Sequence, residues 1–102
     1  MDMKKMMKQA QKMQMELARA QEEIKDMSYE ASAGGGMVKA CATGDMSIKS
    51  LTIDPAAIDQ EDADLLADMV VAAVNEALRG VNEMSSKRLN SATGGMSIPG
   101  LF

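Results

Sequence analysis

The chain has 102 residues, a formal net charge of −4, no histidine and one cysteine. A domain of this length buries a modest share of its surface, and an acidic total argues against a nucleic-acid partner unless the charges are sorted along the molecule. Aromatic residues make up 2% of the chain, so a core must be built from methionine, aliphatic residues and many alanines. A dimer would add the burial that so small a domain lacks.

The residue types also limit the kinds of chemical site that the chain can form. Cys41 lacks a disulfide partner and a histidine base, so we expect a small strand residue and not a nucleophile. Four methionines offer soft thioether ligands for copper, but they also fit a helix repeat, and we expect no metal and no cofactor. These methionines are Met3, Met6, Met7 and Met13. With no membrane-length apolar run and no evident signal peptide, we expect a cytoplasmic protein. With no histidine, no metal-ligand cluster and no nucleophile beside an evident base, we expect a protein that is not an enzyme.

A long helix is predicted at about residues 3–26. From Met3 to Met27 an apolar residue recurs at alternating spacings of three and four, the heptad pattern that keeps one stripe of a helix against a partner helix. The first half of this helix carries four lysines: Lys4, Lys5, Lys8 and Lys12. No acid lies between Asp2 and Glu16, so the helix has one apolar seam and a basic start.

Three short strands follow, at about residues 27–33, 37–43 and 47–53. Each shows apolar or small residues in alternation, and Gly34–Gly36 supply the positive dihedral angles of a hairpin loop. In the third strand Ile48 is out of phase with Leu51 and Ile53, which a β-bulge would reconcile. The pattern predicts an antiparallel meander.

A second long helix is predicted at about residues 60–89. Asp59 and Asp62 resemble a capping arrangement, and further acids complement the positive end of the helix dipole. The helix is apolar on more than one face after Leu65, so we expect cover from two sides, and it narrows later to one stripe. Residues 1–90 therefore form one α+β domain, and residues 91–102 a flexible or docked tail.

The charges sort along this predicted fold. Residues 1–12 hold four lysines and one aspartate, a sum of +3, while residues 54–68 hold six acids and no base. If the two helices pack antiparallel, Lys87 and Arg88 join the basic start of the first helix. Phosphate binding depends on the field within a Debye length of about 8–10 Å, so a basic tip can bind polyanions despite the acidic total. A solvated lysine face is the plainer interpretation.

Several short motifs resemble the YbaB/EbfC family of small bacterial nucleoid-associated proteins. The resemblance covers nearly the whole chain and rests on the order and spacing of its pieces. They are Met7–Gln14, Gly36–Lys39, Ile53–Pro55, Val71–Arg79, Gly94–Met96 and Ile98–Gly100.

The resemblance implies a protomer that dimerises through its sheet, with its long helices projecting like the arms of tweezers. It also implies a nucleoid-associated protein that binds double-stranded DNA with limited sequence preference and alters its conformation. The matching DNA-binding positions are Lys4, Lys5, Lys8 and Lys12, with Lys87 and Arg88 behind them. The alternative is a non-enzymatic interaction module whose Met-rich helix pair docks a protein partner.

Overall fold

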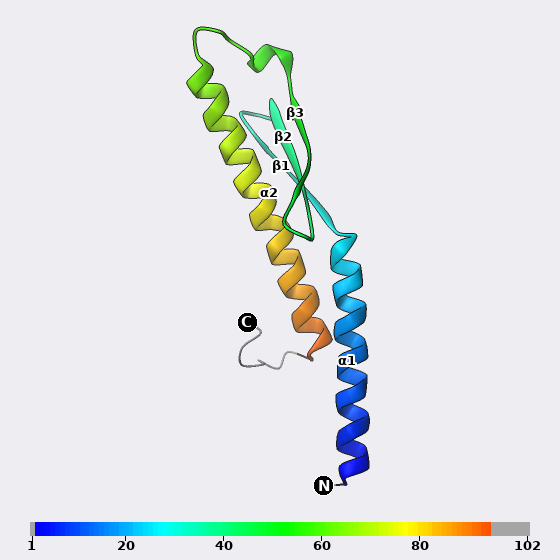
Figure 1. The fold of residues 1–102 in the computed structure, drawn as a ribbon. Coiled ribbons are helices and arrows are strands. Elements are labelled where there is room, and N and C mark those ends of the chain that lie inside the picture. The colour runs from blue at the N-terminus through cyan, green and yellow to red at the C-terminus, as the bar shows by residue number, and fades with distance from the viewer. Residues whose placement is uncertain (1, 95–102) are drawn as a thin grey trace.

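The computed structural model describes residues 2–94 and shows two long helices joined by a three-stranded sheet. The chain is elongated, with extents of 71 × 21 × 17 Å, and α1 continues the long axis beyond the sheet (Figure 1). The predicted α+β class and the order of helix, meander and helix are confirmed. The elements are α1 (Met3–Lys25), β1 (Ser28–Ala33), β2 (Val38–Thr43), β3 (Ile48–Ile53), the 3-10 turn η1 (Pro55–Ala57) and α2 (Ala63–Ala92).

Helix α1 is a single uninterrupted helix of 23 residues. It begins where the Asp2 carboxylate accepts a hydrogen bond from the backbone N–H of Lys4 at 3.1 Å, which satisfies one of the otherwise unpaired donors of the first turn. It ends at Asp26, after which the chain turns directly into β1. Only Ala20 of this helix is fully buried among the described residues, because α2 touches it along one stripe.

The sheet is an antiparallel meander in the order β1-β2-β3. Ala42 of β2 pairs with Ile48, whereas the neighbouring Cys41 pairs with Ser50, so Lys49 is one extra residue in β3. This is the bulge predicted from the apolar phase of the third strand. It places the first apolar residue of β3 on the same face as the two that follow.

The core lies between α2 and the first two strands and is made mostly of alanine. Small side chains let the helix backbone approach the sheet closely. Each of them buries little apolar area, and the burial of apolar area stabilises a fold by about 25 cal/mol per Å². The buried members are Ala31, Val38, Ala40, Ala42, Ala73, Ala77 and Val81. The thin core expected from the composition is therefore observed in the chain.

Helix α2 leaves β3 largely uncovered. Leu51 is 42% exposed and Ile48 is 38% exposed, although both pair with strand positions on the face that α2 covers. Val71 on α2 is also exposed. An apolar edge strand with unpaired backbone groups on its outer side is a surface that proteins ordinarily cover.

The C-terminal end of α2 differs from the prediction. The helix continues through Ala92, so Ser91 and Ala92 belong to it and not to the tail. Thr93 caps it by donating its hydroxyl to the carbonyl of Asn90 at 3.1 Å, and its side chain is buried beside α1. The sequence has no helix breaker before Gly94, which adopts a φ of +66°. Residues 95–102 of the predicted tail lie outside the described residues.

Gly80 of α2 packs directly against the ring of Tyr29 on the sheet. A Cβ added at Gly80 would overlap the ring carbons of Tyr29 on β1. We expect Gly80→Ala to lower the free energy of unfolding in urea, because overpacking costs about 1–3 kcal/mol. The helix propensity of alanine returns about 1 kcal/mol of this at most.

The control is the same substitution in a Tyr29→Ala background. With the ring removed, Gly80→Ala should be neutral or stabilising. Equal destabilisation in both backgrounds would show that the ring contact is not the cause.

Candidate functional site

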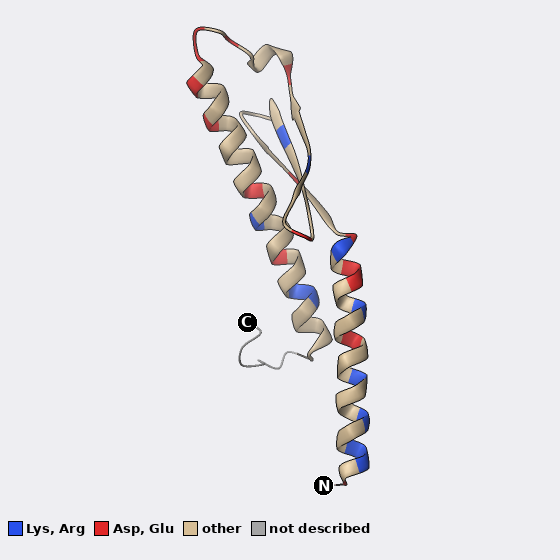
Figure 2. Cartoon of the chain, viewed as in Figure 1, with Lys and Arg blue, Asp and Glu red and all other residues tan. Residues whose placement is uncertain are grey.

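The four N-terminal lysines lie along one side of α1. Lys4, Lys8 and Lys12 are four residues apart, so successive side chains differ by about 40° around the helix axis and rise by about 6 Å, and Lys5 lies beside them. All four are exposed. We call Lys4, Lys5, Lys8 and Lys12 the lysine face. Figure 2 shows these basic positions on the part of α1 that projects beyond the rest of the molecule.

This part of α1 extends past the end of α2. The last turn of α2 and Gly94 meet the middle of α1 at a recess of about 240 Å³, whose α1 side is formed by residues 9–16. Lys4 lies eight residues before Lys12, which is about 12 Å farther along the helix axis. We call residues 3–8 the overhang. Within residues 2–94, the predicted antiparallel packing thus leaves the first turns of α1 without a neighbouring helix.

Arg88 does not lie beside the lysine face as the sequence predicted. Its guanidinium donates to Glu23 through Nε at 2.5 Å and through Nη2 at 3.2 Å, near the sheet end of α1. Glu23 is eleven residues from Lys12, about 16 Å along the axis. The overlap of the helices is shorter than α1 itself, and this offset separates Arg88 from the lysines. Lys87 is exposed on the same turn of α2.

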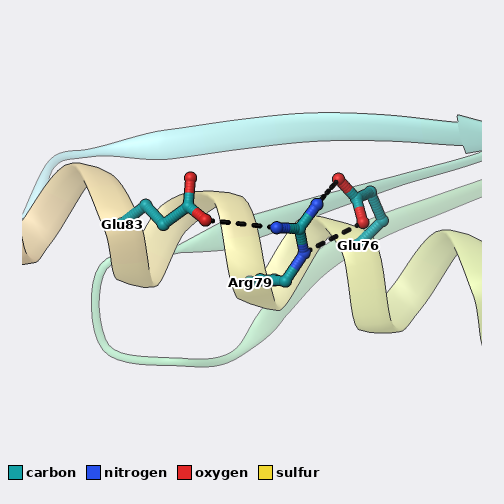
Figure 3. Close-up of polar contacts among 3 residues, drawn as sticks. All are labelled: Glu76, Arg79 and Glu83. Carbon is teal, nitrogen blue, oxygen red and sulfur yellow. Dashed lines mark hydrogen bonds and ion pairs between the residues drawn. The ribbon is translucent and has the colours of Figure 1, made fainter.

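The other arginines are also paired with acids. Arg79 bonds Glu76 at 2.5 Å and Glu83 at 3.2 Å along the exposed side of α2 (Figure 3). Arg19 lies 3.5 Å from Glu16. The spacing of the Arg79 trio, three and four residues apart, is a signal that the sequence carries and that our sequence analysis did not use.

The lysine face differs from these arginines in having no acidic partner. Within residues 2–94, none of its four ammonium groups lies within 4.0 Å of a carboxylate, whereas all three arginines and Lys25 do. A lysine ammonium is a compact charge with three donors that suits single phosphate oxygens. The row is therefore the principal concentration of uncompensated positive charge on the helices.

Other site types have less support. Among the described residues, no group of three or more Cys, Asp and Glu side chains is placed to hold a metal ion. None of the helices within residues 2–94 has both the length and the apolar character needed to cross a membrane. Cys41 is half-buried on the sheet. Within residues 2–94, no buried side-chain nitrogen or oxygen atom lacks a hydrogen-bond partner.

Comparisons with known proteins identify the family of the chain. The sequence model described as the YbaB/EbfC DNA-binding family matches residues 1–96. A protein of Acetivibrio thermocellus named nucleoid-associated protein is 51% identical over 98 residues, covering 95% of this chain and 87% of that protein. A protein of Pelotomaculum thermopropionicum with the same name is 50% identical over 101 residues, covering 99% and 96%.

A solved structure shares the fold. The crystal structure of an uncharacterized protein from Helicobacter pylori matches with a TM-score of 0.68 and 26% identity, covering 92% of this chain and 96% of that one. The family match confirms the resemblance that the motifs predicted. It also confirms a DNA-binding protein over an enzyme.

The ion pair between Arg88 and Glu23 gives the helix junction a pH dependence. The hydrogen bond from Arg88 lowers the pKa of Glu23 below its ordinary value. The pair therefore stabilises the fold fully above the unfolded pKa of glutamate, about 4.3, and this contribution is lost as pH falls through the lower folded pKa. We expect Glu23→Gln to lower the urea midpoint at pH 7, with a difference from wild type that shrinks as the pH falls below the unfolded pKa of glutamate, about 4.3.

The matched control is Glu22→Gln, one position earlier. Glu22 pairs with Lys25 within one turn of α1, where both side chains are well exposed. Such a pair contributes little, so the midpoint should hardly move. An equal effect of both substitutions would argue against a special role for the link between the helices.

Proposed function

Because the chain belongs to the YbaB/EbfC DNA-binding family, we propose that it binds duplex DNA mainly through the phosphate backbone, with the lysine face of α1 as the contact surface. The observation that carries this proposal is the row of lysines without acidic partners on the overhang and the turn that follows it. Lysines that displace condensed counterions from phosphates gain affinity without reading bases.

The acidic total does not oppose this contact. The acids of residues 54–68 lie around η1 and the start of α2, at the other end of the elongated molecule (Figure 2). The molecule is 71 Å long, whereas the Debye length at physiological salt is about 8 Å. DNA at the overhang would meet the lysines and be screened from the distant acids.

The roles of the other two predicted basic residues differ. Lys87 is exposed and is proposed as a peripheral phosphate contact. Arg88, predicted as a DNA contact, is held by Glu23, and we propose that it acts mainly by fixing α1 against α2. A bidentate pair between arginine and carboxylate is suited to such orientation because both groups are planar.

We further propose that two protomers assemble through the uncovered edge strand β3. Leu51 and Ile48 are the exposed apolar residues of that strand. Because the alanine core buries little apolar area, burying these two side chains between protomers would add stability that a single protomer lacks. A dimer would present two copies of α1. Their separation would decide which stretch of duplex is held or bent, and the protein would accompany DNA in the nucleoid.

The second candidate function is a platform for a protein partner. It is favoured by the exposure of Met3, Met6, Met7 and Met15, since methionine surfaces adapt to apolar helices. Binding of that kind would depend weakly on salt. Measuring how binding depends on salt concentration therefore distinguishes the two functions.

The lysine face is tested by the salt dependence of DNA binding. We expect Lys4→Gln with Lys8→Gln to weaken binding of a duplex, measured by fluorescence anisotropy from about 50 to 200 mM salt. The slope of log affinity against log salt should decrease by about 0.9 for each phosphate that is no longer neutralised. Circular dichroism and molar mass should stay unchanged, because both side chains are exposed.

The matched control is Lys39→Gln with Lys49→Gln, which removes the same charge from the sheet. This variant should keep the wild-type slope. If both double variants lower the slope equally, net charge and not the lysine face determines binding. If the wild type binds duplex without salt dependence, the phosphate mechanism is wrong.

The sheet interface is tested by Leu51→Lys. We expect the wild type to have twice the protomer mass of 10.9 kDa by light scattering and the variant to have the protomer mass, because the interface would bury an unpaired ammonium. Thr52→Lys, on the other face of the same strand, should keep the wild-type mass. A Leu51→Lys variant that stays dimeric would place the interface elsewhere.

A further inference from the structure

The overhang carries a second uncovered surface besides the lysine face. Met3 is 74% exposed and Met6 is 50% exposed, and with Ala10 and Met13 they continue the heptad seam of α1. Farther along the helix the same seam packs against α2, where Ala20 is buried. We call Met3, Met6, Ala10 and Met13 the open seam. It is the part of a helix-pairing stripe that lacks a partner helix, because α2 ends first.

The open seam and the lysine face lie on different sides of α1. Met6 and Lys8 are two residues apart, which separates their side chains by about 160° around the axis. A segment that covered Met6 would therefore leave Lys8 accessible. A segment along the first turns of the open seam would leave Lys4 and Lys8 free for a ligand, whereas Lys12 lines the recess beside Met13.

The chain itself leaves α2 at the start of the open seam. Gly94 forms one wall of the 240 Å³ recess, and Met13 forms part of the opposite wall. Eight residues follow Gly94, outside the described part of the chain. Their sequence is Gly-Met-Ser-Ile-Pro-Gly-Leu-Phe, with four large apolar side chains and no Asp, Glu, Lys or Arg.

We propose that residues 95–102 of the same chain dock on the open seam, with Met96 at the recess and Ile98, Leu101 and Phe102 against the overhang. The length allows it: eight residues span up to about 26 Å, while Met13 to Met3 covers about 15 Å of helix. The chemistry fits because apolar side chains without charge match the exposed thioethers of the open seam. Leaving both surfaces in water would expose two apolar stripes within reach of each other.

This docking would give the overhang the neighbour that α2 does not provide. The first two turns of an isolated helix fray readily, because few tertiary contacts hold them. A segment packed along the seam would hold these turns helical and keep Lys4 and Lys8 in line. The inference concerns the fold of the chain and does not depend on DNA binding.

Disulfide trapping in the full chain tests the position of the segment. In a Cys41→Ser background, cysteines are placed by Met6→Cys with Ile98→Cys. The matched pair is Lys8→Cys with Ile98→Cys, on the opposite side of the same turns. We expect the first pair to form an internal disulfide several times faster under mild oxidation, because docking raises its effective concentration.

Each outcome decides the question. Equal rates for the two pairs would overturn the proposal, since an undocked segment samples both sides of the helix. A disulfide at position 6 that links two chains would also overturn it, because the seam would then hold the segment of another copy. Non-reducing electrophoresis distinguishes internal from intermolecular products.

A second measurement needs no new cysteine. Phe102 and Tyr29 are the only aromatic residues of the chain. With the methionine methyl groups labelled, Phe102→Leu should shift the NMR signals of Met3 or Met6 and leave that of Met69 in place. Unchanged signals for all open-seam methionines would contradict contact with the ring.

Discussion

The close packing of α2 on β1 and β2 is the contact on which the other features depend. It is possible because the buried positions are mainly alanine, with Gly80 at the point where Tyr29 lies against the helix. Close approach gains contact between backbones but buries little apolar area, so the protomer has a small reserve of stability. The same packing fixes the direction of α2 and thereby the place where it meets α1.

The direction of α2 also explains the division of the molecule into ends with different properties. Because the helix crosses two strands, β3 keeps an exposed apolar side near one end. Because α2 stops beside the middle of α1, the overhang extends past the other described elements at the other end, with lysines on one side and methionines on another. The surface proposed for assembly and the surface proposed for DNA are thus separated along the long axis of the molecule.

Much of this could be predicted from the chain. The heptad seam, the alternation in the strands and the phase break at Ile48 indicated the elements, their order and the bulge. The offset between the helices could not be predicted, because it depends on how far the alanine-lined helix travels across the sheet. The partner of Arg88 followed from that offset: Glu23 is 65 residues away in sequence and carries no local signal of the pairing.

The continuity of α1 has a consequence for how such a chain can change in length. No break separates the sheet from the lysine face, so the helix transmits rotation as well as distance. Inserting one residue between Lys12 and Ile24 would rotate the lysine row by about 100° around the helix axis. It would lengthen α1 by only about 1.5 Å. Inserting seven residues would lengthen α1 by about 10 Å and rotate the lysine row by only about 20°. The length of α1 and the direction in which its lysines point are therefore coupled. Only insertions of about seven residues lengthen the helix and keep that direction nearly unchanged.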